Sequence, residues 1–297
     1  MSALNINELC KGLSKQRNSA LLSFMFNKGE PISRIHLHKT NELIKEKKYD
    51  KLDIILHSSG GDINATYQII ELLRAHSKEL TAIIPIYAKS AATLFILSSK
   101  KVIMGELAEL GPLDAQVIER KGGTKIYTSA LNPFKTLEEL QRFAIQTLDI
   151  TVKLILARAE HSIEEAIKLS IDFVSKILPP LFSQIKVEKM GENSRALEVG
   201  REYGKRLLKR YSMFQREDKR ESILRRLIYQ YPSHGYVIDY KEMQDMGFEV
   251  EFPEENTKEI IEGIIENVLS ENFKTQIFLI EQNKNNNLVK EKDDKNE

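Results

Sequence analysis

Two short segments of the chain hold residues that could perform acyl-transfer chemistry. Gly60 and Gly61 follow the apolar run 52–56, and Ser90 follows the apolar run 80–88. Adjacent glycines let the backbone turn sharply and present bare N–H groups to a ligand. A serine between a buried strand and a helix lies at the edge of a parallel sheet, where it could act as a nucleophile. Together, these segments indicate an oxyanion hole and its nucleophile.

Taken singly, each segment also has an ordinary structural explanation. Gly-Gly pairs are common in tight turns, and serines commonly cap helices. The catalytic interpretation becomes competitive because the two segments mark consecutive strand–helix crossovers. In that arrangement the amides of Gly61 and Ala91 would be the oxyanion donors, with Gly60 in the same turn. The dipole of the helix after Ser90 would also favour an anion there.

A serine nucleophile needs a base, and the histidines are poorly placed for that role. His161 lies in a helix-capping segment, and His234 lies in a turn-like segment far along the chain. Lys135 is the better candidate. A lysine acts as a base only in its neutral form, which burial or a positive neighbouring potential favours. Pro133 and Phe134 offer it an apolar wall, and the adjoining helix N-terminus disfavours the ammonium form.

Other basic side chains are weaker candidates. Lys153 is a rival base, but it falls away from the apolar stripe of its predicted helix. Lys89 is adjacent to Ser90, yet alternation along the strand directs its side chain elsewhere. His36 and His38 share a face of a predicted strand without a neighbouring Cys or acid pattern. We therefore expect no metal site, and nothing in the sequence implies an organic cofactor.

The hydrophobic pattern predicts the elements that position these residues. The order strand–helix–strand–helix–strand indicates crossovers on a largely parallel sheet, with Asp62 capping the first helix. The strands are predicted at 52–58, 80–88 and 101–105, and the helices at 62–76 and 90–100. Before them we expect a helix over 8–25, a strand over 32–38 and a helix over 40–49.

The chain becomes largely helical after residue 130. Thr136 with Glu139, and Ser162 with Glu165, are predicted capping boxes, and the Pro179–Pro180 pair should end a helix. Two more helices are expected at 193–213 and 216–230, and a strand–helix–strand segment at 234–252. We expect an α/β core over 1–130, a helical C-terminal region over 131–280 and a disordered tail over 281–297.

Composition narrows the possible function classes. The 297 residues are 41% hydrophobic and 29% charged, and the net charge is +1. That balance gives no electrostatic argument for nucleic acid or an anionic membrane. A single cysteine, Cys10, excludes an intramolecular disulfide framework. The N-terminus lacks the pattern of a signal peptide, and no apolar window is long enough to span a bilayer, so we expect a cytoplasmic protein.

One stretch of the sequence is similar to a known family. The segment "LDIILHSSGGDINATYQIIELLRAH", followed by "TAIIPIYAKSAATLFILSSKKVIMGELAELGPLDAQV", resembles the serine dehydrogenase proteinase family. That family belongs to the Clp protease and crotonase-like fold group, alongside signal peptide peptidase A. The resemblance is strongest over residues 51–118, and it extends thinly to about residue 252. It implies an α/β Clp protease/crotonase-like fold and assembly into homo-oligomers.

The resemblance also assigns roles to individual residues. Ser90 is similar to the family's nucleophile, and Gly61 and Ala91 are similar to its oxyanion donors. The segment 132–148 looks like the one that carries the lysine base in related archaeal membrane-associated serine proteases, which supports Lys135. The position at which Clp-type peptidases place their histidine falls near the Gly111–Pro112 pair, which argues against a Ser-His-Asp triad.

Two departures from the family pattern leave alternatives open. Residues 58–61 read Ser-Ser-Gly-Gly where the family usually has Thr-Pro-Gly-Gly, and residues 90–93 read Ser-Ala-Ala-Thr in place of Ser-Gly-Gly-Thr. Alanine beside the nucleophile could constrict the site. One alternative is therefore a catalytically degraded binding or scaffold protein of the same fold. Another is a crotonase-like acyl-coenzyme A enzyme, although no acidic residue is convincingly placed for its chemistry.

The leading hypothesis is a cytoplasmic serine peptidase. Lys135 would take the proton from Ser90 as its oxygen attacks a peptide carbonyl, and the backbone amides would hold the oxyanion. The expected partners are a peptide or protein substrate and further copies of the chain, with no nucleic acid. No transmembrane segment indicates membrane association.

Overall fold

The computed structural model describes residues 5–212 and 214–281. They divide into two compact units, which we describe separately. The sheet unit comprises Met1–Leu113 and Gly200–Glu297, and the hairpin unit comprises Asp114–Val199. The sheet unit carries the glycine turn and Ser90, and the hairpin unit carries Lys135.

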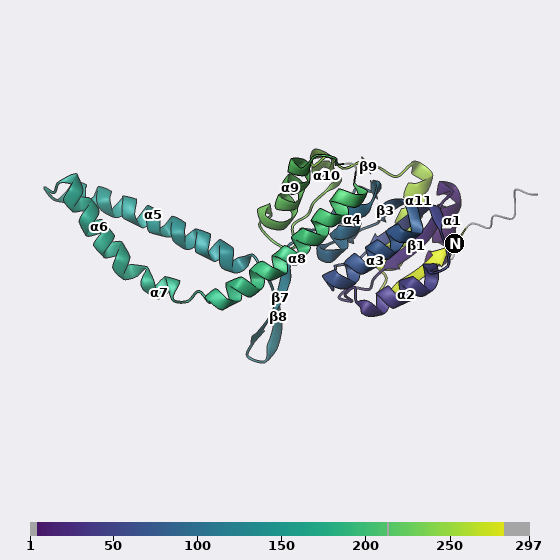
Figure 1. Ribbon diagram of the computed structural model, residues 1–297, viewed down its shortest axis with the longest axis horizontal. Coiled ribbons are helices and arrows are strands. Elements are labelled where there is room, and N and C mark those ends of the chain that lie inside the picture. Colours follow the sequence, from purple (N-terminus) through teal and green to yellow (C-terminus); the bar gives the residue numbers. More distant parts are fainter. Residues whose placement is uncertain (1–4, 213, 282–297) are drawn as a thin grey trace, which may run out of the picture. The chain divides into compact units, whose positions relative to one another are not determined.

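A six-stranded sheet is the centre of the sheet unit, with strand order β10-β1-β2-β3-β5-β9. Five strands run parallel, and β10 pairs antiparallel with β1 at one edge (Figure 1). In chain order the strands are β1 Ala20–Met25, β2 Tyr49–His57, β3 Ser77–Ile84, β5 Lys101–Met104, β9 Val250–Glu251 and β10 Gln276–Ile280. All six residues of β1 are buried, because helices cover both faces of the sheet.

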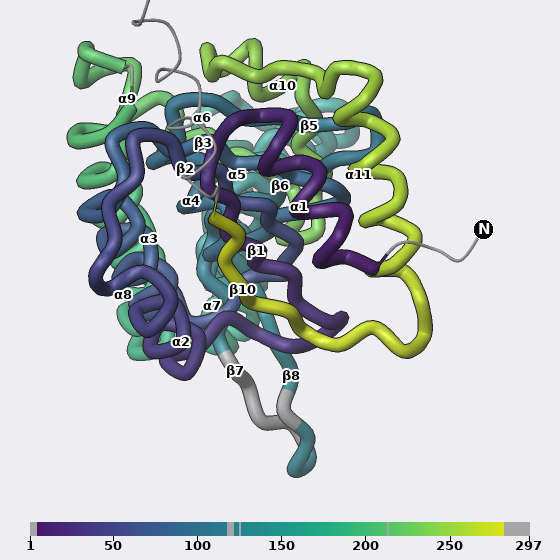
Figure 2. The backbone as a smooth tube through the Cα atoms, turned by 90° about the vertical axis from the view of Figure 1, so that its right-hand side faces the viewer, coloured from purple at the N-terminus to yellow at the C-terminus, as the bar shows by residue number. Residues whose placement is uncertain are grey.

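Helices lie on both sides of this sheet (Figure 2). Helices α1, Ile6–Arg17, and α11, Glu255–Val268, pack against each other on one face. Helices α2, Arg34–Ile44, and α3, Ile63–His76, contact each other on the opposite side. A long helix, α8, Val187–Tyr211, begins in the hairpin unit and ends in the sheet unit.

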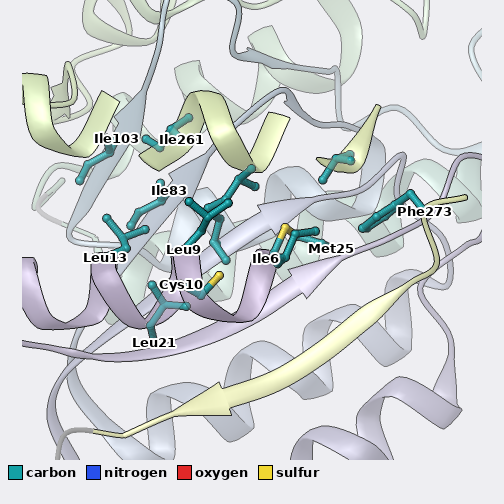
Figure 3. Packing of buried hydrophobic residues seen from close by; sticks show 13 residues of the cluster. Ile6, Leu9, Cys10, Leu13, Leu21, Met25, Ile83, Ile103, Ile261 and Phe273 are labelled. Carbon is teal, nitrogen blue, oxygen red and sulfur yellow. The ribbon is translucent and has the colours of Figure 1, made fainter. Parts of the chain in front are cut away.

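The apolar core under α1 and α11 joins residues that are far apart in the sequence (Figure 3). Leu9 and Leu13 of α1 meet Ile83 and Ile103 of the central strands and Ile261 of α11. Cys10 lies within this cluster, and burial raises the pKa of its thiol to about 12. The thiolate is therefore inaccessible at neutral pH, so Cys10 acts as a small apolar side chain.

Short elements surround the carboxyl ends of the central strands. Strands β4, Tyr87–Ala88, and β6, Glu109–Leu110, form a separate two-stranded parallel sheet. A 3-10 turn, η1, Ser90–Ala92, leads directly into α4, Thr93–Ser98. The C-terminal part of the unit also contains α9, Glu217–Arg225, the π-helical turn η2, Arg226–Gln230, and α10, Tyr240–Asp245.

The hairpin unit consists of a strand pair and a helix pair. Strands β7, Gln116–Lys121, and β8, Thr124–Ser129, pair antiparallel. Helices α5, Asn132–Arg158, and α6, Ile163–Ile177, pack against each other and are followed by the short helix α7, Pro179–Phe182. Ser162 and Glu165 form the predicted capping box at the start of α6, which confirms that prediction.

The predicted crossovers on a parallel sheet are confirmed, but two expectations for the first fifty residues are wrong. Residues 34–44 form α2 rather than a strand, and Ser33 and His36 form a capping box at its start. The expected helix over 8–25 ends at Arg17, where Asn18 takes a left-handed φ of 49°. Residues 20–25 form β1 instead, because a continuous apolar run fits a strand buried on both faces.

The helical half of the chain brings two further differences. The predicted Thr136–Glu139 capping box is wrong, because α5 begins at Asn132 and the Thr136 hydroxyl donates to the Asn132 carbonyl inside it. Strands β9 and β10 return to the sheet, so the two units do not follow the expected division at residue 130. Apart from Glu281, the tail expected to be disordered, 281–297, lies outside the described residues.

Candidate active site

The end of β2 and the start of η1 are held together by backbone hydrogen bonds. The Ser58 amide donates to the Tyr87 carbonyl at 3.0 Å, and the Lys89 amide donates to the Ser58 carbonyl at 3.0 Å. These bonds form a parallel bridge between Ser58 and Ala88. The bridge therefore aligns the two segments that the sequence singled out, the glycine turn and Ser90.

The glycine turn requires both of its glycines. Gly60 has a φ of +102° and Gly61 a φ of +149°, which L side chains rarely adopt. The Gly60 carbonyl accepts from the Ile32 amide, and the Asp62 amide donates to the Ile32 carbonyl, each at 2.8 Å. A Cβ on Gly61 would lie 2.3 Å from the Ile32 nitrogen, so no side chain fits there.

Ser90 lies at a strained turn between β4 and α4. Its φ of +54° is one of two positive values among the described residues other than glycine. A left-handed conformation costs a non-glycine residue about 1 kcal/mol or more, and such strain is concentrated at functional sites. The side chain is partly buried, and its hydroxyl makes no hydrogen bond to the described part of the chain. The hydroxyl is therefore available to a bound substrate.

Gly60 is in direct contact with the segment that carries Ser90. A Cβ built on Gly60 would lie 2.8 Å from the Lys89 carbonyl oxygen and 2.8 Å from the Ser90 Cβ. It would also lie 3.1 Å from the Ala91 nitrogen. The glycine turn and the serine are thus neighbours in space, and only a residue without a side chain leaves room between them.

The backbone amides around Ser90 differ in their availability. The Gly60 amide donates to Ser58 Oγ at 3.1 Å, and the Ala92 amide donates to the Lys89 carbonyl at 3.0 Å. Within the described ranges, the amides of Gly61 and Ala91 have no hydrogen-bond acceptor. These two amides can therefore donate to a ligand, whereas Gly60 allows the two turns to approach each other closely.

Lys89, which precedes Ser90, is held at both its backbone and its side chain. Its amine lies 2.6 Å from Glu109 Oε1 and donates to the Gly235 carbonyl at 3.4 Å. A Cβ on Gly111 would lie 2.9 Å from the Lys89 Cβ, so the two segments pack closely. This ion pair could not be predicted from the sequence, because its partners lie on separate segments of the sheet unit.

His57 is close in sequence to the glycine turn but is buried in the sheet. Only 3% of its surface is exposed, and its ring centroid lies 4.1 Å from that of Tyr87. Its Nδ1 atom is buried without a hydrogen-bond partner in the described structure. Burial lowers the pKa of the imidazole to about 4, so the ring is neutral at neutral pH. His57 is the last residue of β2.

Lys135 belongs to the hairpin unit, so the compact arrangement around Ser90 is built without it. Its amine pairs with Glu138 Oε2 at 2.9 Å, and its side chain is 53% exposed. Lys153, the rival base, is exposed on the same helix. His234 is partly buried and precedes Gly235, whose carbonyl accepts from Lys89. The sheet unit thus brings Gly60, Gly61, Ser90 and Ala91 together.

The described residues hold neither a metal-binding cluster nor a membrane-spanning helix. They contain no group of three or more His, Cys, Asp or Glu side chains that could hold a metal ion. Across the same ranges, no helix combines the length and the apolar character needed to cross a membrane.

The family comparison identifies the chain. A family model described as "ClpP-like SDH-type serine proteinase" matches residues 29–203, more than half of the chain. The chain belongs to this family. The matched range includes the glycine turn, Ser90 and the segment that carries Lys135, so the resemblance found in the sequence is confirmed at the family level.

Individual relatives are similar over different lengths. Uncharacterized protein MJ0137 of Methanocaldococcus jannaschii is 26% identical over 222 residues, 61% of this chain and 78% of that protein. Uncharacterized protein MJ1495 of the same organism is 39% identical over 66 residues, 22% of this chain and 23% of that protein. A solved structure of a mutant of the 1510-N membrane-bound stomatin-specific protease is 12% identical, with a TM-score of 0.31, and covers 50% of this chain and 67% of that one.

Proposed function

We propose that this member of the ClpP-like SDH-type serine proteinases hydrolyses peptide bonds with Ser90 as its nucleophile. The Ser90 oxygen attacks the carbonyl carbon of the substrate and forms a covalent acyl-enzyme, while the amine of the cleaved bond leaves. The amides of Gly61 and Ala91 donate to the oxyanion of the tetrahedral intermediate. Removing one such donor typically costs about 3 kcal/mol of transition-state stabilisation.

The observation that carries the proposal is the contact between the glycine turn and the serine turn. Only a glycine at position 60 allows this contact, because a hypothetical Cβ there would lie 2.8 Å from the Ser90 Cβ and 3.1 Å from the Ala91 nitrogen. Within the described residues, the Ser90 hydroxyl and the Ala91 amide of this strained turn make no hydrogen bond, and neither does the amide of Gly61 in the adjoining glycine turn. A purely structural turn would have no need of this strain.

Ala91 and Ala92, the departures from the family pattern, are compatible with an open site. Ala91 is 3% exposed and Ala92 is fully buried. Their methyl groups therefore pack largely inside the protein, and little of their surface faces an incoming substrate. The backbone amide of Ala91 is retained regardless of the side chain, so the substitution preserves the donor that the mechanism requires.

Lys135 is the proposed general base, on the strength of the sequence pattern around it. It would accept the Ser90 proton, pass it to the leaving amine and then activate the water that releases the acyl group. To do so, its amine must leave Glu138 and lose its own proton. Because Lys135 and Ser90 belong to different units, the arrangement of the two units determines whether the dyad forms.

The rate of labelling by a fluorophosphonate probe tests both assignments. Ser90→Ala should abolish labelling, and Lys135→Ala should slow it about 100-fold, the usual contribution of a general base. Lys176→Ala is the matched control, because Lys176 is another exposed helix lysine paired with an acid, Asp172, at 2.6 Å. It should label at the wild-type rate.

Other outcomes would reassign the base or the function. A large loss of labelling in Lys153→Ala or His234→Ala, with Lys135→Ala unaffected, would contradict Lys135 as the base. A folded wild-type protein that never labels would favour a degraded scaffold. Retention on immobilised coenzyme A, with no peptide hydrolysis, would favour the acyl-coenzyme A alternative.

A further inference from the structure

Helix α5 has one side that packs on α6 and another that packs on no described residue of the hairpin unit. None of its 27 residues is buried, although many are apolar. Leu137, Leu148 and Ile155 are partly buried, as expected for the side that contacts α6. On the other side Phe143 is 45% exposed, and Ile150 is 57% exposed. An isolated pair of helices that exposes this much apolar surface lacks a partner.

The side chains on this second side follow a regular spacing, and Phe143, Ile150 and Leu154 among them are exposed. Leu140, Phe143, Thr147, Ile150 and Leu154 alternate steps of three and four residues. Such a repeat keeps one continuous stripe on a helix and is the pattern of a coiled-coil seam. We call these five residues the α5 stripe. Its spacing indicates that the missing partner is another helix lying along α5.

Three large apolar side chains of the α5 stripe are exposed. Phe143 is 45% exposed, Ile150 is 57% exposed and Leu154 is 44% exposed. In a coiled coil such a row is buried against the facing helix, so an exposed row of this kind favours a helical partner.

Charges beside the stripe favour a particular partner and orientation. Glu139, Gln146 and Lys153 are spaced seven residues apart, so they lie along one flank of the stripe. If a second α5 ran antiparallel with the two-fold axis at Gln146, each Glu139 would face Lys153 of the other copy. A parallel pair would instead bring Lys153 toward Arg158 of the other copy, a repulsive contact.

We propose that a second copy of this chain packs antiparallel along the α5 stripe, with Gln146 at the two-fold axis. Phe143 of each copy then lies beside Thr147 of the other, and Leu140 beside Ile150. Two reciprocal Glu139–Lys153 pairs fix the register. Within one chain Glu139 already contacts Arg142 at 3.1 Å, an exposed pair that can exchange for the new one.

A lipid or nucleic-acid surface fits this face less well. The charged residues near the stripe carry a net charge of only +1, and they are Glu139, Arg142, Asp149, Lys153 and Arg158. An anionic membrane or nucleic acid would need an excess of basic residues on the polar flank. Vesicles containing anionic lipid are therefore a negative control for the dimer experiment.

Sedimentation of the full-length protein tests the surface. Wild type should be dimeric, and Ile150→Glu should raise the dimer dissociation constant at least about tenfold, because a buried carboxylate has no partner at the seam. Ile145→Glu is the matched control, since Ile145 is 63% exposed on the same helix but lies off the stripe. A monomeric wild type, or equal effects of the two substitutions, would overturn the proposal.

Charge exchange and cross-linking test the orientation. Glu139→Lys and Lys153→Glu should each weaken the dimer several-fold, and the double substitution should restore it, because it exchanges the charges of both reciprocal pairs. Gln146→Cys should form a disulfide-linked dimer on oxidation, whereas Gln141→Cys should not. The native Cys10 is buried and should form no disulfide on oxidation. No rescue in the double variant, or cross-linking of Gln141→Cys alone, would contradict the antiparallel register.

Discussion

At the scale of residues, the two glycines of the turn have different structural roles. Gly61 has a backbone position that no side chain fits, because a Cβ would strike Ile32. Gly60 instead allows the turn to approach Ser90 and the Ala91 amide closely, while its own amide donates to Ser58. The sequence predicted the amides of Gly61 and Ala91 as the oxyanion donors, with Gly60 in the same turn. Only the structure shows which group the Gly60 amide contacts.

Gly60→Ala should therefore damage the site more than glycine strain alone can explain. The new methyl group meets Ser90 and crowds the Ala91 amide, so we expect fluorophosphonate labelling to slow about 100-fold. Gly29→Ala is the control, because Gly29 has a φ of +82° but nothing within 4 Å of a Cβ. It should lose about 1 kcal/mol of stability and label normally. Equal labelling of the two variants would contradict the role given to Gly60.

His57 should make the folded protein sensitive to acid. Its pKa falls from 6.5 to about 4 on burial, so the unfolded chain binds a proton in that range while the folded protein does not. Stability is then fully present above pH 6.5 and is lost as the pH falls toward 4, by about 3 kcal/mol. Urea denaturation of His57→Phe, which keeps a ring against Tyr87, should show a smaller loss. Identical pH profiles would refute the assignment.

At the scale of elements, the sequence predicted the crossovers that position the site, and they are present in the structure. Apolar runs flanked by turn residues identify β2, β3 and β5, because strands buried on both faces need such runs. The alternating pattern over 32–38 was misleading. Helix α2 begins there at Arg34, and the Nδ1 atom of His36 accepts from the Ser33 amide at 3.0 Å. A local capping interaction outweighed a short periodicity of two.

The sequence could not reveal β10, because its partner is distant in the chain. Gln276 pairs with Met25, and Ile280 pairs with Leu21, in an antiparallel register. Helix α11 and this strand lie in a region that we expected to be mostly helical. Only the long-range pairing, with its completed hydrogen bonds along β1, explains why an isolated apolar run becomes a strand.

Removing β10 should expose the edge of β1. A chain ending at residue 275 lacks Ile277, which is 4% exposed, and leaves one side of β1 unpaired. We expect it to unfold at a lower temperature and to aggregate more readily than a chain ending at residue 281, which keeps the strand. Thermal denaturation and light scattering of the two chains make the comparison. Indistinguishable curves would mean that β10 contributes little to stability.

At the scale of the whole molecule, family membership supports the class of protein, and local geometry supports the arrangement around Ser90. The family gives the class, a serine proteinase, and the sheet unit gives the neighbours of Ser90. The proposed base is the part of the site that the sequence predicts least directly. Lys135 belongs to the hairpin unit and is paired with Glu138. Its assignment depends on how two units cooperate, which no local pattern encodes.

The most direct test of the central claim is the site of covalent modification by a fluorophosphonate probe. Mass spectrometry of the labelled, digested protein should find the adduct on Ser90 alone, and Ser90→Ala should remain unmodified while folding as the wild type does. An adduct on a different serine, or undiminished labelling of Ser90→Ala, would contradict the assignment of Ser90 as the nucleophile.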